Sequence, residues 1–307
     1  MDSGCNWNVR SSLVYLTVLS VIFGSASCYA GSLPDSKAPF SNSNPKTVVR
    51  NGYTIEIFET AQDQLRYARA WFSDPLEKQA ALEVLIAQYP QPADVRAEAE
   101  LELAYLALGG DYRFAGERAC RNALRQYERI AAQFSDLPDI AAKAHWYMGW
   151  IYADLLRQKK DALAHYHIIV ARYPDAVLKL EPPVPWVSLV LPRNADRPPA
   201  VYESPVYPWR SMALLEIIRN SDDDEEKWTA FERLWARDQV GTITGHALLA
   251  LLRGSPTLGQ RASGPARIYL QTQPAGRSLA KEMRTVLPPA SQNDTGRPPS
   301  SGHQGAP

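Results

Sequence analysis

The sequence predicts an all-α protein: a short array of helical hairpins followed by additional C-terminal helices. Three segments share one pattern, in which Ala-Leu opens a helical stretch and an aromatic residue followed by Pro or Ser closes it: ALEVLIAQYP (81–90), ALRQYERIAAQFS (123–135) and ALAHYHIIVARYP (162–174). The closing aromatic residues recur at similar intervals, at Tyr89, Phe134 and Tyr173. A single unit of this size cannot bury its own apolar face, so its recurrence predicts stacked helical units.

Composition sets broad limits on the class of protein. The 307 residues fit one large domain or two smaller ones, and 45% apolar residues suffice for a sizeable core. Lys plus Arg and Asp plus Glu both number 33, so the charge balance does not favour a nucleic acid or an anionic membrane surface as partner. The three cysteines, Cys5, Cys28 and Cys120, form no CxxC pair and have no zinc-ligand spacing.

The N-terminal 30 residues predict an export signal. An apolar run over 13–28 follows Arg10 and ends in small residues. The run is shorter than the roughly 20 residues that a membrane-spanning helix needs. Two exits remain open: a lipobox-like Ser-Ala-Ser-Cys ending at Cys28, which would be lipidated, or ordinary cleavage after Ser27 or Ala30. We therefore expect a periplasmic protein or a lipoprotein attached to the outer membrane through Cys28.

Residues 31–52 are expected to form a disordered tether, because Ser, Pro and Asn dominate the stretch after the signal. At its end, Asn51-Gly52 stands between two runs rich in β-branched residues. This pattern is typical of a β-hairpin, and it is also compatible with a loop that leads into a helix.

Residues 53–178 are expected to form the helical array. A helical period starts at Thr60, and Asp74-Pro75 marks a break after which the next helix runs to Pro90. Asp94 can cap the following helix, which Gly109-Gly110 ends.

Three further helices complete the predicted array: one over 123–134, one that begins at Asp139, and its partner over 162–173. The residues expected to pack between the helices are Leu82, Tyr89, Ala123, Tyr127, Phe134, Gly149, Tyr152, Ala162, Tyr166 and Tyr173.

The last helix pair resembles a tetratricopeptide repeat. Residues close to the positions of that family's pattern are Trp146, Met148, Gly149, Tyr152, Ala162, Tyr166 and Pro174. The resemblance weakens toward the N-terminus and covers over a third of the chain. It implies that small residues at 149 and 162 let neighbouring helices approach closely. The sequence of the third segment (162–174) is also similar to that of exported bacterial tetratricopeptide proteins. These include outer-membrane assembly lipoproteins and cell-division coordinators of the envelope.

The C-terminal third begins with a Pro-rich stretch, residues 179–208, expected to be an extended linker or a strap along the array. Residues 209–287 are expected to form a second helical segment, with helices over 209–220, from a capping box at Ser221 and Asp224, over 244–253 and around 278–286. Residues 288–307 are expected to be a disordered tail.

No motif of a known catalytic class occurs in the chain, so the sequence predicts no enzyme, no cofactor and no metal site. His165 and His167 lie two residues apart, so on a helix they point to different faces and could not share a metal. Cys120 has helical spacing with apolar neighbours, which predicts a buried side chain and not a nucleophile.

The sequence therefore predicts a non-catalytic scaffold or adaptor of the bacterial cell envelope that binds another envelope protein or a peptide in a groove, and no nucleic acid. The partner-binding residues would be Glu98, Glu102, His145 and Trp150, with Trp150 as an exposed aromatic anchor. Two alternatives remain open: an accessory domain or subunit of a cell-wall-acting enzyme with an unrecognised active site, and a purely structural envelope lipoprotein. The partner, the oligomeric state, lipidation, and whether the C-terminal helices pack on the array are left undetermined.

Overall fold

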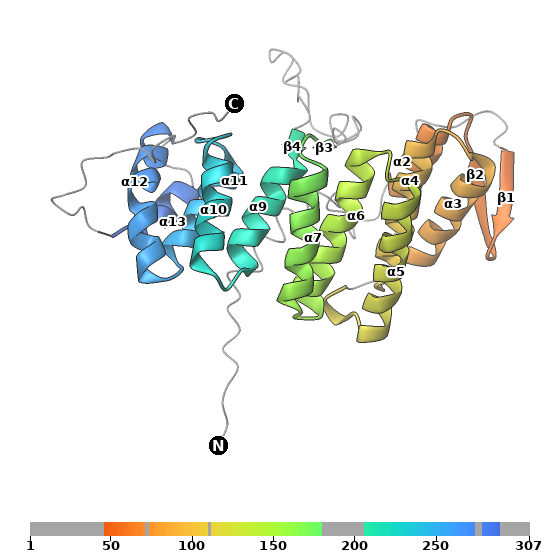
Figure 1. Cartoon of the computed structure of the whole chain (residues 1–307). Helices are drawn as coiled ribbons and strands as arrows, with labels where there is room; N and C mark the ends of the chain where they lie inside the picture. The colour runs from red at the N-terminus through yellow and green to blue at the C-terminus, as the bar shows by residue number, and fades with distance from the viewer. Residues whose placement is uncertain (1–45, 71–73, 110–111, 180–205, 274–277, 289–307) are drawn as a thin grey trace, which may run out of the picture. The chain divides into compact units, whose positions relative to one another are not determined.

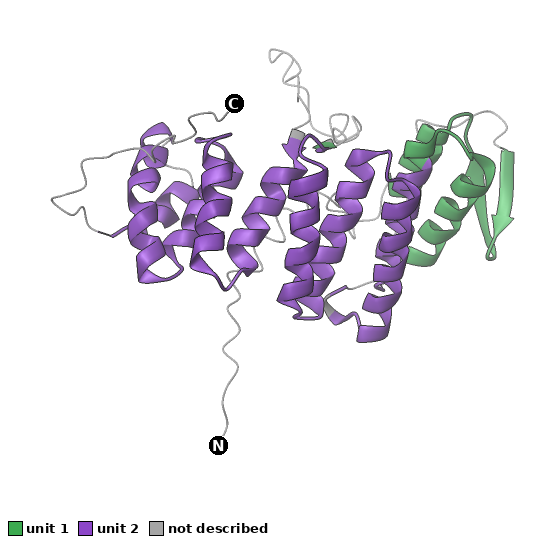
Figure 2. Cartoon of the chain, viewed as in Figure 1, with its two compact units in different colours: residues 1–95, 178–206 green, residues 96–177, 207–307 purple. Residues whose placement is uncertain are grey.

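The computed structural model describes residues 46–70, 74–109, 112–179, 206–273 and 278–288 (Figure 1). This part of the chain is mostly α-helical, with two small two-stranded sheets, which confirms the all-α class. It divides into two compact units, residues 1–95 with 178–206 and residues 96–177 with 207–307 (Figure 2). The predicted array over 53–178 is therefore shared between two units. The predicted export signal, Cys28, most of the Pro-rich stretch and nearly all of the C-terminal tail lie outside the described residues.

The first unit begins with a β-hairpin, one of the two structures that the sequence allowed. Strand β1 (Lys46–Arg50) pairs antiparallel with β2 (Tyr53–Ile57). The turn residues Asn51 and Gly52 have φ values of 52° and 84°, as a tight two-residue hairpin turn requires. Strand β1 lies within residues 31–52, which were expected to form a disordered tether. That expectation was wrong for β1, because its β-branched residues pair with β2.

Two helices, α2 (Ala61–Ala70) and α3 (Pro75–Gln88), complete the first unit. Asp74 caps α3 by accepting a hydrogen bond from the Leu76 N–H at 2.9 Å. The buried Gln64 side chain accepts from the Phe58 N–H at 3.0 Å and donates to the Glu56 carbonyl at 3.0 Å, which ties α2 to the chain leaving β2. Leu82 is fully buried, as predicted, and the Tyr89 hydroxyl donates to the Phe58 carbonyl.

The second unit starts within α4 (Ala93–Leu106), which is followed by η1 (Tyr112–Phe114), α5 (Glu117–Gln133), α6 (Pro138–Trp150), the π-helical turn η2 (Ile151–Leu155) and α7 (Lys159–Arg172). Helix α6 packs between α5 and α7. Cys120 is fully buried on α5, and burial raises the pKa of its thiol. The predicted buried stripe of α5 is confirmed by Ala123, Tyr127 and Phe134.

Helices α6 and α7 approach closely at Gly149. A Cβ atom there would lie 2.6 Å from Cε1 of Tyr166, which is itself fully buried. Ala162 is also fully buried, whereas Tyr152 and Tyr173 remain partly exposed. A small residue at position 149 is thus a steric requirement of this helix pair.

The C-terminal helices belong to the same compact unit as α5, α6 and α7, a relationship that the sequence left undetermined. They are α9 (Trp209–Asn220), α10 (Asp224–Trp235), α11 (Thr242–Leu252), α12 (Pro256–Thr272) and α13 (Ser278–Val286). Helix α9 packs against α7 (Figure 1) and also contacts α10 and α11. The Trp209 N–H donates to the Ala176 carbonyl at 3.0 Å, and the Trp209 ring lies 6.0 Å from that of Trp146. Short strands β3 (Val177–Lys179) and β4 (Val206–Pro208) pair where the chain enters and leaves the Pro-rich stretch.

One local expectation for the C-terminal helices was wrong, and one helix was not predicted. The N-cap of α10 is Asp223, whose carboxylate accepts from the Glu225 N–H at 2.9 Å, and not the predicted Ser221. Helix α12 was not predicted, because Gly259, Gly264 and Pro265 lower its helix propensity. Burial of four residues at helical spacing outweighs that cost: Leu258, Ala262, Ala266 and Tyr269.

Candidate functional site

The predicted partner-binding face involves α4 and α6. Glu98 on α4 forms an ion pair with Lys143 on α6, with 2.6 Å between Oε2 and Nζ. The Lys143 side chain is only 12% exposed, so this pair is better shielded from solvent than a surface ion pair. Glu102 is half-buried, and its charge adds to burial in raising the pKa of Tyr127 and of Tyr147. The two carboxylates thus lie beside a buried tyrosine cluster.

The expectation that Trp150 is exposed was wrong. Trp150 is 2% exposed and lies edge-on to the Tyr112 ring of η1, with 5.3 Å between the ring centroids. Tyr112 also contacts Tyr105, whose ring in turn lies 6.5 Å from that of Tyr147. The short segment after α4 therefore covers Trp150, which is a core residue and not an interface anchor.

His145 contacts a histidine of the neighbouring helix. Its Nδ1 atom lies 3.1 Å from Nδ1 of His165 on α7. Tyr152 stacks on the His165 ring at 5.6 Å, and Tyr173 lies against the His145 ring at 5.9 Å. Two predicted packing tyrosines thus hold a histidine pair in place. The sequence comparison of His165 with His167 missed this pair, because it considered neighbours on one helix only.

The environment of the histidine pair favours neutral rings. Burial, the neighbouring His165 and Arg172 together lower the pKa of His145 to about 4. Burial also lowers the pKa of His165, against an opposing effect of Asp161. At neutral pH one imidazole therefore donates an N–H to the other. Across the described ranges, no group of three or more His, Cys, Asp or Glu side chains is placed to hold a metal ion.

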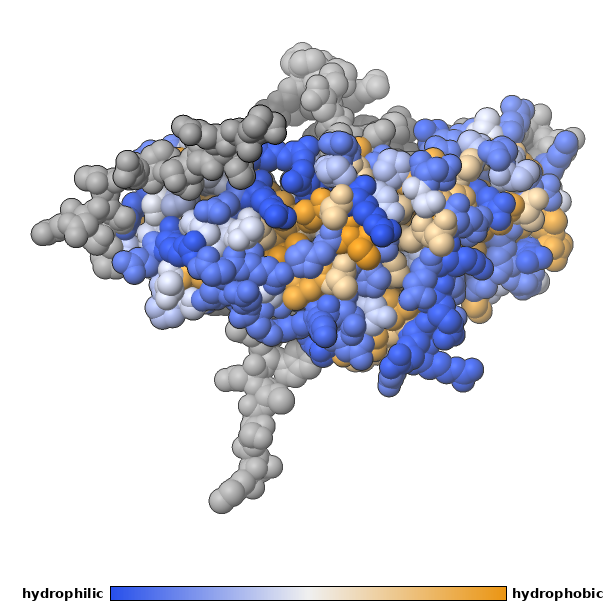
Figure 3. All heavy atoms as spheres, viewed as in Figure 1, coloured by the Kyte–Doolittle hydropathy of each residue, from blue (hydrophilic) through white to orange (hydrophobic). Residues whose placement is uncertain are grey.

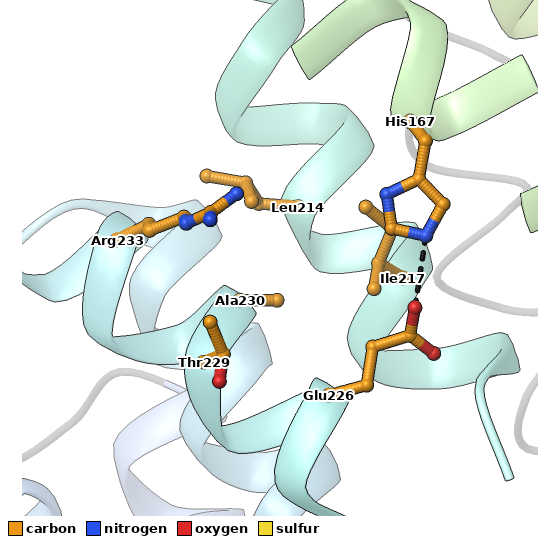
Figure 4. Close-up of a pocket in the computed structure, with 7 residues that line it drawn as sticks. All are labelled: His167, Leu214, Ile217, Glu226, Thr229, Ala230 and Arg233. Atoms are coloured by element: carbon orange, nitrogen blue, oxygen red, sulfur yellow. Dashed lines mark hydrogen bonds and ion pairs between the residues drawn. The ribbon is translucent and has the colours of Figure 1, made fainter. Parts of the chain in front are cut away.

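A pocket of ≈ 290 Å³ lies between α7, α9 and α10 (Figure 4). Leu214 and Ile217 of α9, together with Ala230 of α10, form its apolar floor. Thr229 lies at its edge. Figure 3 shows an apolar area among polar residues on the face where α7 and α9 lie side by side. This pocket is the candidate functional site.

Charged side chains stand at two opposite edges of the pocket (Figure 4). His167 of α7 donates from Nε2 to Oε1 of Glu226 on α10 at 2.8 Å. On the other side, the exposed Arg233 extends beside Leu214 and makes no ion pair with any residue in the described part of the chain. The rim thus combines a hydrogen-bonded His–Glu pair with an arginine that has no ion pair in the described part of the chain.

The sequence patterns predicted none of the residues that line this pocket as site residues. Helices α7 and α9 are neighbours in space, but the Pro-rich stretch separates them in the chain. One signal was available in the sequence: the run MALLEII (212–218) is apolar except at Glu216, and a helix that is apolar on most sides occupies a central position between others. The structure buries all of Ser211–Ile218. Its neighbours could not be read from that pattern.

No protein-family model, curated protein or solved structure matches the chain. Within the described ranges, every helix is too short or too polar to cross a lipid bilayer.

Proposed function

We propose that this protein is a non-catalytic scaffold that binds a protein or peptide partner, and that an apolar side chain of the partner enters the pocket between α7, α9 and α10. The pocket carries the proposal, because it combines an apolar floor with polar and charged groups at its edge. Interfaces of proteins commonly place an anchor side chain in such a desolvated depression and surround it with polar contacts.

We further propose that α4 to α7 form an array of the tetratricopeptide type. Support comes from the residues that resemble that family's pattern. Gly149 lies against Tyr166, Ala162 is fully buried, and the closing aromatic residue of α5, Phe134, is 6% exposed. Helix α9 continues the packing on α7, so the pocket lies at the C-terminal side of this array.

The proposed partner is another protein of the bacterial cell envelope. This part of the proposal rests on the N-terminal sequence, where an apolar run precedes Cys28. Mass spectrometry of the mature protein tests it: a diacylglycerol adduct on Cys28 indicates a lipoprotein, and an unmodified start after Ser27 or Ala30 indicates a freely exported protein. A retained residue 1–30 segment in the mature protein would contradict export by either route.

The proposal that the pocket binds the partner is tested by blocking the pocket with a bulky side chain. Thr229 is exposed at the pocket edge, so Thr229→Trp can block the pocket without disturbing the core, and Thr229→Ala is the matched open control. A partner recovered with the wild-type protein and with Thr229→Ala should be lost with Thr229→Trp. A photo-crosslinking residue at position 229 should form an adduct with the same partner, whereas one at the exposed Arg125 of α5 should not. Equal recovery with both Thr229 variants would contradict the proposed site.

A further inference from the structure

We propose that the pocket between α7, α9 and α10 receives the C-terminal residue of a partner polypeptide, with its apolar side chain on the floor and its α-carboxylate on Arg233. This inference rests on the proposed function and specifies the chemistry of the ligand.

The size of the pocket limits the apolar part of the ligand. Its volume of ≈ 290 Å³ is at the lower end of the range for small-molecule pockets. Leu214, Ile217 and Ala230 are each at most 4% exposed, so they offer a narrow apolar floor and not a broad face. One side chain of the size of leucine fits these limits better than a helix face, which needs a groove several turns long.

The charges around the pocket indicate an anionic ligand. Glu226 accepts a hydrogen bond from His167 at 2.8 Å, and the neighbouring Glu225 forms an ion pair with Arg261. Glu232, next to Arg233 in the chain, accepts a hydrogen bond from the Trp228 indole at 2.7 Å. Each of these carboxylates therefore has a partner within the protein, whereas Arg233 has no ion pair within the described residues.

The position of Arg233 beside the floor distinguishes among anions. A guanidinium group binds a carboxylate through two parallel hydrogen bonds, and nearby apolar surface strengthens that pair by excluding water. Inorganic phosphate has no apolar part to cover Leu214 and Ile217. An internal Asp or Glu carries its carboxylate on its own side chain, while the adjacent apolar side chain points elsewhere. Among the residues of a polypeptide, only the C-terminal one carries an apolar side chain and a carboxylate on the same Cα atom.

The test uses three probes with the full chain: acetyl-Ala-Ala-Leu with a free carboxylate, the same peptide as its C-terminal amide, and acetyl-Ala-Ala-Ala with a free carboxylate. Methyl NMR shifts of Leu214 and Ile217 report occupancy. We expect the free leucine peptide to bind with a Kd on the order of 1 mM, and the other two probes about tenfold more weakly. Arg233→Gln should remove the preference for the acid over the amide, and Arg118→Gln on α5, also exposed, should preserve it.

The outcomes separate this inference from the proposed function. Equal binding of acid and amide, abolished by Thr229→Trp, would overturn the role of the carboxylate and leave the pocket as a binding site. A preference for the acid that persists in Arg233→Gln would overturn the role of Arg233. Equal binding of the leucine and alanine peptides would overturn the role of the floor. Absence of binding by all three probes would overturn the inference as a whole, whereas the proposed function fails only if Thr229→Trp also leaves partner recovery unchanged.

Discussion

Gly149 of α6 and Tyr166 of α7 are in such close contact that a Cβ atom at position 149 would lie 2.6 Å from Cε1 of the tyrosine ring. Tyr166 is fully buried, so its ring is enclosed by other parts of the protein. Replacing Gly by Ala in a helix ordinarily adds up to about 1 kcal/mol of stability, but overpacking a core costs about 1–3 kcal/mol. We therefore expect Gly149→Ala to lower the free energy of unfolding by up to about 2 kcal/mol in urea titrations, which is the difference between these two effects.

Gly259 in α12 is the matched control. The nearest atom that a Cβ there would meet is the Leu252 carbonyl oxygen, at the ordinary contact distance of 3.4 Å. Gly259→Ala should leave the free energy of unfolding unchanged or raise it by up to about 1 kcal/mol. A similar loss in both variants would show that the α6–α7 contact is not the cause.

The Tyr166 hydroxyl is a buried polar group without a hydrogen-bond partner among the described residues, and burial is the main cause that raises its pKa. Tyr166→Phe should therefore keep or raise the free energy of unfolding, by up to about 1 kcal/mol, because it removes a desolvation cost. The Tyr53 hydroxyl, in contrast, donates to Asp74 at 2.8 Å, so Tyr53→Phe should lower the free energy of unfolding. A larger loss with Tyr166→Phe than with Tyr53→Phe would contradict this account.

The histidine pair predicts that stability falls with acidification. The pKa of His145 is about 4 in the folded protein, below its ordinary value of 6.5. Between these pH values the unfolded chain binds a proton that the folded chain does not, so the free energy of unfolding decreases as the pH falls through this window. The stabilising effect of the neutral ring is complete above about pH 6.5. Chemical denaturation at a series of pH values measures the slope.

Substitution separates this pair from other groups that titrate in the same range. His145→Asn should reduce the slope, because one group with a lowered pKa is removed. The charged groups that act on the pair are Asp161 and Arg172. Burial also lowers the pKa of His246 to about 4, so His246→Asn should give a second, additive reduction. An unchanged slope in His145→Asn would contradict the assignment.

Trp209 links the C-terminal helices to α6 and to the chain after α7. It is 1% exposed, and its ring lies 6.0 Å from that of Trp146. Trp209→Ala should cost about 3–5 kcal/mol, as expected for removing a buried tryptophan. Because α9 is the helix that packs on α7, we expect calorimetry to show one transition for these helices in the wild type and separate transitions in the variant. Trp209→Phe, which retains part of the contact, should cost less and keep a single transition.

Local structure was largely predictable from the sequence. The helical period of Ala123 and Tyr127 predicted the buried stripe of α5, and α13 was expected where it lies, over Ser278–Val286. Such signals are reliable because residues three and four apart in an α-helix share a face whatever the rest of the fold does. Helix α12 escaped prediction because its propensity is poor and its stability comes from burial.

The candidate site was decided by the tertiary structure. His145 and His165 are 20 residues apart in the chain and come within 3.1 Å only because α6 packs on α7. Trp150 is buried because η1 covers it, and the pocket exists because α9 returns to α7 after the Pro-rich stretch. The periodicity of a helix indicates that one of its faces is buried, but not which distant segment covers that face. That choice depends on the fit of side chains across long separations in the chain. At position 149, one added methyl group would clash with the Tyr166 ring.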